Sequence, residues 1–178
     1  MEHSYLIVVD MQNDFVTGAL GSREAAAIVP SVVQKITQFT GTVLFTKDTH
    51  KDNYMETQEG KKLPVPHCIQ DTDGWNLIPE IANLPKVQNP SRIFLKETFG
   101  STKLAETLVK EHAEHPISSI TLIGVCTDIC VISNALLIKA FLPEVPIFVD
   151  PACCAGVTPQ THDAALKTME SCQICVSE

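Results

Sequence analysis

Side chains that can act as a base, a cation, a nucleophile or a metal ligand stand where short apolar runs of this sequence end. In chain order they are Asp10, Lys47, Asp48, His50, Lys96, Cys126, Cys130 and Asp150. A carboxylate, a lysine and a thiol together can make a hydrolytic nucleophile with its base, and a carboxylate beside a histidine can bind a metal ion. Neither helix packing nor solubility requires this concentration, so we expect most of these side chains to share one site.

The stretch ITLIGVCTDICV contains two cysteines, and they could be a metal pair, a redox pair, packing atoms or a nucleophile. Thr127 is expected to cap the helix that follows, which places Cys130 in the first turn. The unpaired amides and the dipole there favour an anion, so the pKa of this thiol is expected to fall. Cys126 ends the strand and is expected to pack. Asp10 would be the base, with Lys96 holding the charge of the pair.

Short apolar runs that alternate with amphipathic segments must position these residues. The expected strands are Tyr5–Val9, Thr42–Thr46, Arg92–Leu95, Ser119–Gly124, Pro146–Val149 and Gln173–Val176. The expected helices are Arg23–Phe39 (capped by Ser22, with Pro30 as a kink or boundary), Asn76–Ala82, Ser101–His112 (capped by Ser101), Thr127–Phe141 and Pro159–Met169. Strands without strict alternation are buried on both faces, which predicts an α/β fold with a mostly parallel sheet covered by helices. In such sheets, ligands bind beyond the carboxyl ends of the strands.

The segment from Lys47 to Asn76 is polar and long for a loop, which is typical of a functional segment. The chain has seven cysteines, an odd number, so free thiols are expected rather than a disulfide framework. Cys172 and Cys175 have CxxC spacing, but they belong to an expected final strand, which does not favour a redox or metal role. Asp150 is expected to be structural.

Composition limits the class of protein. A chain of 178 residues, with 44% hydrophobic and 19% charged residues, suits one globular domain over residues 1–178. A formal net charge of -8 without a long basic run argues against nucleic acid and anionic membranes as partners. No apolar stretch approaches the roughly 18 residues of a membrane helix, and the first residues lack a signal layout. A cytoplasmic location is therefore expected.

Five stretches, in this order, resemble motifs of the isochorismatase-like cysteine hydrolase superfamily, and in particular its nicotinamidase branch. They are VVDMQNDFVTGAL, TKDTH, PHC, FLKETFGST and GVCTDICV. The resemblance implies a three-layer α/β/α sandwich with a six-stranded, mostly parallel sheet. It also implies a catalytic triad of Asp10, Lys96 and Cys130, an oxyanion hole from the backbone amides of Cys126 and Cys130, and a cis peptide bond before Cys126.

The same resemblance implies a divalent metal ion, with zinc expected and iron or manganese as alternatives. The matching ligand positions are Asp48, His50 and His67, and Glu59 is a further candidate. The ion would bind the ring nitrogen of nicotinamide. Phe15 is expected to form one wall of the substrate site. The aromatic residue that nicotinamidases place before the later histidine is missing from the sequence LPVPH, and Trp75 is a candidate replacement.

The activity that this resemblance implies is cysteine-dependent hydrolysis of nicotinamide to nicotinate and ammonia through a thioester. An isochorismate-like or N-carbamoyl substrate is the alternative within the superfamily, and a non-catalytic binding member is the alternative outside enzymes. A Cys130–His162 dyad is a further alternative for the chemistry. The expected partners are a small-molecule amide substrate and, in a homo-oligomer, further copies of the chain.

Overall fold

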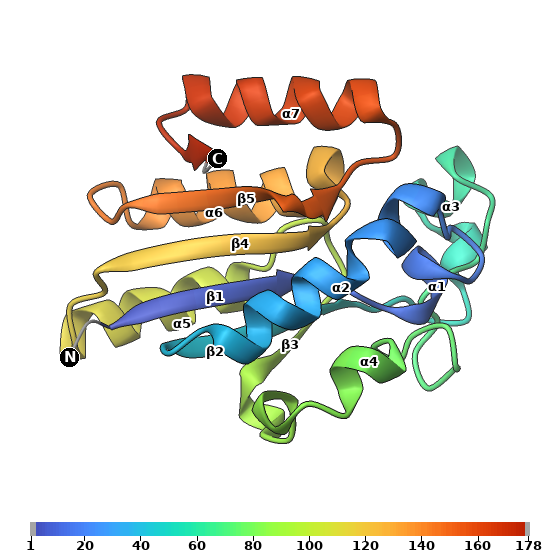
Figure 1. Ribbon diagram of the computed structural model, residues 1–178. Coiled ribbons are helices and arrows are strands. Elements are labelled where there is room, and N and C mark those ends of the chain that lie inside the picture. Colours follow the sequence, from blue (N-terminus) through green and yellow to red (C-terminus); the bar gives the residue numbers. More distant parts are fainter. Residues whose placement is uncertain (1–2, 177–178) are drawn as a thin grey trace.

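The computed structural model describes residues 3–176, and its centre is a parallel sheet with helices on both faces (Figure 1). The strands are β1 (Ser4–Val9), β2 (Thr42–Asp48), β3 (Ile93–Lys96), β4 (Ser119–Val125), β5 (Ile147–Ala155) and β6 (Cys175–Val176). They are ordered β3-β2-β1-β4-β5-β6, and each neighbouring pair is parallel. The predicted sandwich with a six-stranded sheet is confirmed.

Helix α2 (Arg23–Gln38) covers one face of the sheet, while α5 (Thr102–Glu114) and α6 (Ile132–Phe141) cover the other (Figure 1). Helix α7 (Pro159–Ser171) packs against α6 and β6. The shorter helices are α1 (Asn13–Val16), α3 (Gln58–Lys62) and α4 (Pro79–Ala82). Within residues 3–176, none of the helices combines the length and hydropathy that a membrane span requires.

Two predicted helix caps are confirmed by hydrogen bonds. The Ser22 hydroxyl accepts the backbone N–H of Ala25 at 3.0 Å, and the Ser101 hydroxyl accepts that of Leu104 at 3.2 Å. Pro30, predicted as a kink or boundary, lies inside α2, which continues to Gln38. The buried face of this helix outweighs the one backbone hydrogen bond that a proline removes.

Strand β5 differs most from its predicted span, because it runs through Asp150 to Ala155. Its pairing with β4 shifts register between Leu122 and Gly124, so the strand continues past the irregularity. Asp150 therefore lies inside the strand and not after it. Its carboxylate accepts a hydrogen bond from Lys35 Nζ at 2.7 Å, which joins β5 to α2.

The long polar segment after β2 contains two short helices that the sequence analysis does not predict. They are the single 3₁₀ turn Tyr54–Glu56 and helix α3. The Thr57 hydroxyl accepts the N–H of Gly60 at 3.0 Å and so caps α3. Tyr54 is buried, which ties this segment to the body of the protein.

Gly124 lets β1 and β4 approach each other just before both strands end. Its φ is +115°, and a Cβ atom there would lie 2.1 Å from the carbonyl oxygen of Val9. Val9 and Gly124 are register partners, so the next residues along each strand, Asp10 and Val125, emerge side by side. A residue without a side chain is therefore required at this point.

Replacing Gly124 with alanine is expected to destabilise the protein by about 2–4 kcal/mol, because the added Cβ meets backbone and the positive φ adds strain. Urea denaturation measures the loss. Gly100→Ala is the matched control, since its Cβ would lie 3.2 Å from the nearest atom, and a change within about 1 kcal/mol is expected. Equal stability of the two variants would contradict this account.

Candidate active site

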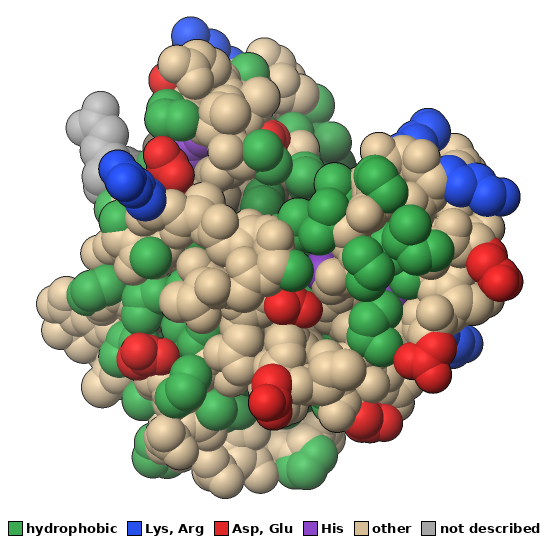
Figure 2. All heavy atoms as spheres, turned by 90° about the vertical axis from the view of Figure 1, so that its right-hand side faces the viewer, with side chains coloured by type: hydrophobic (Ala, Val, Ile, Leu, Met, Phe, Trp, Pro, Cys, Tyr) green, Lys and Arg blue, Asp and Glu red, His purple; other side chains and the backbone are tan. Residues whose placement is uncertain are grey.

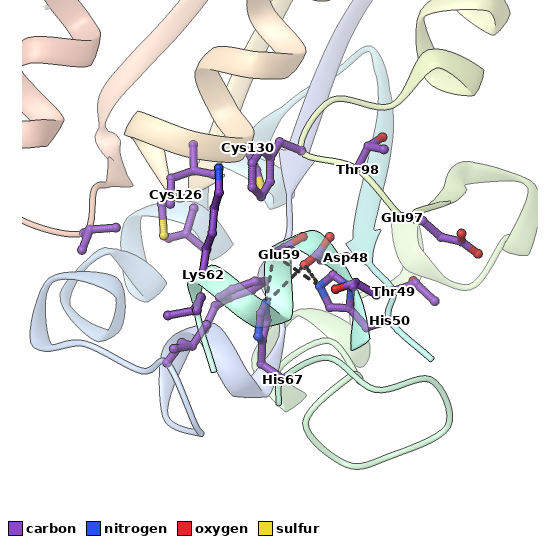
Figure 3. Close-up of a pocket in the computed structure, with 18 of the residues that line it drawn as sticks. Asp48, Thr49, His50, Glu59, Lys62, His67, Glu97, Thr98, Cys126 and Cys130 are labelled. Atoms are coloured by element: carbon purple, nitrogen blue, oxygen red, sulfur yellow. Dashed lines mark ion pairs between the residues drawn. The ribbon is translucent and has the colours of Figure 1, made fainter. Parts of the chain in front are cut away.

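A cavity of about 970 Å³ opens at the carboxyl ends of the strands. The chain adds β2 and β3 on one side of β1 and adds β4, β5 and β6 on the other, so the switch in strand order lies between β1 and β4. The walls of the cavity come from the α1–α2 connection, the segment after β2, and the residues after β3, β4 and β5 (Figure 3). This is where open parallel sheets bind ligands, as the sequence predicts.

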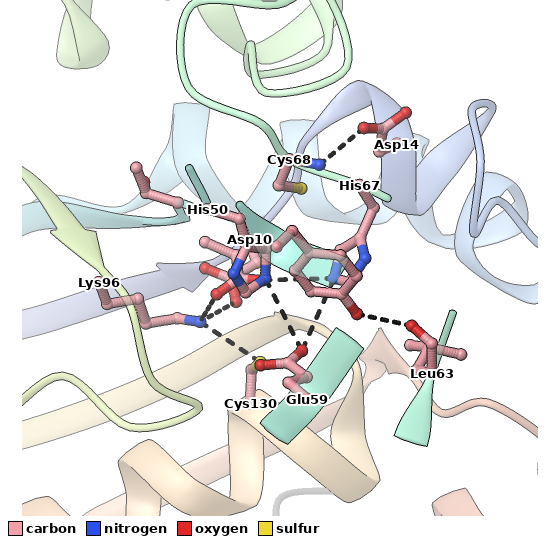
Figure 4. A network of polar contacts seen from close by, with 12 residues as sticks. Asp10, Asp14, His50, Glu59, Leu63, His67, Cys68, Lys96 and Cys130 are labelled. Carbon is pink, nitrogen blue, oxygen red and sulfur yellow. Dashed lines mark hydrogen bonds and ion pairs between the residues drawn. The ribbon is translucent and has the colours of Figure 1, made fainter. Parts of the chain in front are cut away.

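Asp10, Lys96 and Cys130 meet behind the part of the cavity wall that Cys130 forms (Figure 4). Asp10 and Lys96 are buried and do not line the cavity. Lys96 Nζ lies 2.7 Å from Asp10 Oδ2 and 3.4 Å from Cys130 Sγ. It also lies 3.0 Å from Asp48 Oδ1. Burial alone would lower the pKa of Lys96, but Asp10, Cys130 and Asp48 outweigh it and raise the pKa. The lysine therefore carries its charge at neutral pH.

The Asp10 carboxylate is completely buried and held from two sides. Its Oδ1 accepts a hydrogen bond from the Thr46 hydroxyl at 2.6 Å, and its Oδ2 faces Lys96. The residue has φ 49°, a left-handed conformation that aspartate tolerates better than most side chains. Burial raises the pKa of Asp10, although Lys96 lowers it, so this carboxylate is a stronger base than an exposed aspartate.

The Cys130 thiol does not behave as the sequence predicts. Burial raises its pKa well above the ordinary value, the Asp10 carboxylate raises it further, and Lys96 only partly offsets both. The predicted cap is also wrong. Cys126 is the N-cap of a π turn (Thr127–Val131), and the Thr127 hydroxyl makes no cap but contacts His162 Nδ1 at 2.8 Å. The thiol is therefore protonated at rest and requires a base.

The His162 ring nitrogen is paired with Thr127, and His162 does not line the cavity, which disfavours the alternative Cys130–His162 dyad. The expected cis peptide bond between Val125 and Cys126 is present. The Cys126 side chain packs against the core, as expected, and also lines the cavity. Its carbonyl accepts the N–H groups of Ile129 and Val131, which shapes the turn that carries Cys130. The oxyanion hole stays a prediction.

Beside this triad, the four predicted metal ligands converge. One ligand atom from each of Asp48, His50, Glu59 and His67 lies within 4.8 Å of all the others. His50 Nε2 is 3.0 Å from Asp48 Oδ2 and 3.7 Å from Glu59 Oε1. His67 Nε2 lies 3.6 Å and 3.8 Å from the same two oxygens. The sequence predicts Glu59 as a further ligand, and α3 carries it to this set.

The donor atoms of this set suit a divalent ion. His67 Nδ1 lies 2.8 Å from the carbonyl oxygen of Val65, so Nδ1 donates a hydrogen bond, and in the neutral imidazole Nε2 offers its lone pair to the set. His50 Nε2 is buried and makes no hydrogen bond within the described residues. Burial would raise the pKa of Asp48, but contacts with both histidines and Lys96 lower it, so the carboxylate is ionised. Two imidazoles and two carboxylates fit zinc, iron or manganese.

Comparison with known proteins agrees with this geometry. The family model for the isochorismatase domain matches residues 4–178. The chain belongs to the isochorismatase family. Within the family it resembles the nicotinamidase of Schizosaccharomyces pombe, with 25% identity over 211 residues that cover 97% of this chain and 91% of the relative.

Two solved structures of family relatives superpose over almost the whole chain. The nicotinamidase/pyrazinamidase of Bacillus subtilis has a TM-score of 0.81 and 26% identity, covering 100% of both chains. The pyrazinamidase of Pyrococcus horikoshii, solved in complex with zinc, has a TM-score of 0.75 and 25% identity, covering 99% of both chains. The family model and the superposition on solved structures thus agree on the fold and the family.

Of the two aromatic residues that the sequence offers for this isochorismatase-family site, one lines the cavity and the other does not. Phe15 lines the cavity as predicted, and its ring meets that of His67 edge-on at 5.5 Å. Trp75 does not line the cavity, because its indole N–H donates to Thr49 Oγ1 at 2.9 Å. Lys47 Nζ lies 3.0 Å from the Trp75 ring centroid, so these two residues stabilise each other outside the site.

Two aromatic site residues were not predicted. Tyr54 packs against both histidines of the candidate metal set, with ring centroids 4.7 Å from His50 and 5.1 Å from His67, and its hydroxyl donates to the Leu63 carbonyl at 2.9 Å. Phe99 lines the cavity from the segment after β3. The sequence contains a signal for Phe99, because a residue shortly after Lys96, at the end of a strand, is expected to lie near the site. The sequence contains no such signal for Tyr54, because this residue lies in the polar segment after β2.

Removing the Lys96 charge by Lys96→Met should shift the pH profile of Cys130 alkylation by iodoacetamide to higher pH. The sign follows from the contact, since Lys96 lowers the pKa of the thiol and its loss leaves burial and Asp10 unopposed. Turnover is expected to fall by roughly 10²-fold. Lys103→Met, an exposed change on α5, is the control. Superimposable profiles of wild type and Lys96→Met would remove Lys96 from the site.

Proposed function

We propose that this protein is a nicotinamidase-like amidohydrolase, which converts nicotinamide and water to nicotinate and ammonia through a thioester on Cys130. Family membership and similarity to nicotinamidases support a hydrolase that acts on an amide C–N bond. The observation that carries the proposal is the position of Lys96 Nζ, 2.7 Å from Asp10 and 3.4 Å from Cys130, beside a set of four metal-ligating side chains. A binding protein would not require a buried base, cation and thiol together.

In the first half of the reaction, Asp10 takes the proton of the Cys130 thiol and the sulfur attacks the amide carbon. A C–S bond forms, and the carbonyl oxygen becomes an oxyanion, which the backbone amides of Cys126 and Cys130 are proposed to stabilise. A good donor in such a hole contributes roughly 3–4 kcal/mol. As the C–N bond breaks, Asp10 gives its proton to the nitrogen, and ammonia leaves.

In the second half, a water molecule attacks the thioester while Asp10 takes its proton. The C–S bond breaks, the sulfur regains that proton from Asp10, and the carboxylic acid leaves and releases its remaining proton to solvent. Lys96 keeps its positive charge throughout, next to whichever of Asp10 and Cys130 is negative. One base thus serves both halves of the cycle.

Asp48, His50, Glu59 and His67 are the residues that would hold the divalent ion. When bound, the ion supplies a Lewis acid that can hold a ring nitrogen of the substrate. The chain's own contribution is rigidity. Gln12 Oε1 accepts the backbone N–H of Asp48 at 2.7 Å, and Gln12 Nε2 donates to its carbonyl at 2.9 Å, which fixes that ligand against the end of β1.

Cys130→Ala is expected to abolish ammonia release from nicotinamide and to leave the fold intact, because the thiol is needed for chemistry only. Cys126→Ala should keep most of the activity, since the mechanism uses only its backbone amide. An ammonia-release assay with circular dichroism of each variant decides this. An inactive Cys126→Ala beside an active Cys130→Ala would reverse the assignment.

Removing the metal should abolish turnover of nicotinamide, and adding zinc, iron or manganese should restore it. His67→Ala is expected to lower the bound metal content, because it removes one of the four ligands. Elemental analysis of the purified protein and the ammonia assay are measured on the same sample. Full activity of protein that is verified to be metal-free would contradict the proposed role of these residues.

A further inference from the structure

The cavity is larger than a single-ring carboxamide requires. Its volume of about 970 Å³ is at the upper end of the roughly 300–1,000 Å³ typical of sites for drug-sized ligands. Cys130 and the four candidate metal ligands form only part of its wall. The rest of the wall is formed by other residues, and in the proposed amidase these residues would determine which amide fits.

Much of the remaining wall is apolar and faces solvent. Leu63, Phe99 and Val157 are 39%, 46% and 55% exposed, and all three line this cavity. Leu20 and Ile129 line it as well. Figure 2 shows hydrophobic side chains around a hollow in this face, with histidine visible inside it. Apolar side chains that line a cavity and remain exposed are typical of a surface that a ligand covers.

One lysine that lines the cavity has no counter-charge among the residues that the structure describes. Lys51 and Glu97 also line it, but they pair with each other at 3.0 Å. Asp48 and Glu59 belong to the metal set, where a divalent ion would balance them. Lys62, on the last turn of α3, makes no ion pair within residues 3–176. Its side chain extends from α3 toward the part of the cavity where Cys126 lies (Figure 3).

We propose that Lys62 is a specificity-determining residue that binds an anionic group on the substrate. The substrate class is then a primary carboxamide joined through an apolar body to a carboxylate. The amide lies over Cys130, the apolar body packs on the exposed apolar residues of the wall, such as Phe99 and Val157, and the carboxylate pairs with Lys62. This inference rests on the proposed function, which supplies the position of the amide.

The test compares nicotinamides that carry a ring-attached alkyl chain ending in a carboxylate with the same compounds ending in an alcohol. A series of chain lengths is used, and Kd is measured by calorimetry on the metal-loaded Cys130→Ala variant, which binds without turnover. The best carboxylate is expected to bind about tenfold more tightly than its alcohol. Lys62→Gln should remove this difference, and Lys62→Glu should reverse it.

Lys61→Gln is the matched control, because Lys61 is the neighbouring exposed lysine on α3 and does not line the cavity. It should keep the preference for the carboxylate. Equal Kd values for the two ligand series in wild type, or the same loss in Lys61→Gln as in Lys62→Gln, would overturn the assignment. Because binding is measured without turnover, this result is separate from that of the ammonia assay, whose failure would instead overturn the proposed amidase activity.

Discussion

The buried ammonium of Lys96 constrains the rest of the site, because a charge without water must be paired. Its partners are Asp10 at 2.7 Å, Asp48 at 3.0 Å and Cys130 at 3.4 Å. These residues come from the ends of β1 and β2 and from the turn after β4, while Lys96 itself ends β3. One cation therefore ties four segments of the sheet edge together. Through Asp48 it also links the triad to the metal ligands.

Main-chain pairing brings these partners close before any side chain contributes. Asp48 and Lys96 are register partners at the ends of β2 and β3, and Val9 pairs with Gly124 just before Asp10. Because the strands are all parallel, every one of their carboxyl ends reaches the same edge. Local hydrogen bonds, such as that from Thr46 to Asp10, then orient the side chains toward one another.

The parts of this site that follow from strand ends could be predicted from the sequence, and the parts that follow from tertiary burial could not. Asp10 and Lys96 were located correctly because apolar runs mark where buried strands stop. The predicted pKa direction of Cys130 was wrong because local helix position predicts a decrease, whereas burial beside a carboxylate dominates. Tyr54 was missed because a single 3₁₀ turn has no periodic signal. Asp150 was misplaced because a register shift extends β5.

A thiol with a raised pKa can still serve as the nucleophile in the proposed mechanism, because its proton goes to a carboxylate whose pKa is also raised. Moving the proton from Cys130 to Asp10 moves one negative charge from the carboxylate to the sulfur. The net charge of the buried group is the same before and after, because the proton stays within the group, and both positions contact Lys96 Nζ. Desolvation raises the pKa of both groups, so it largely cancels from the transfer between them. The relevant quantity is thus the difference between the proton affinities of Cys130 and Asp10, which the contacts of Lys96 and Thr46 influence.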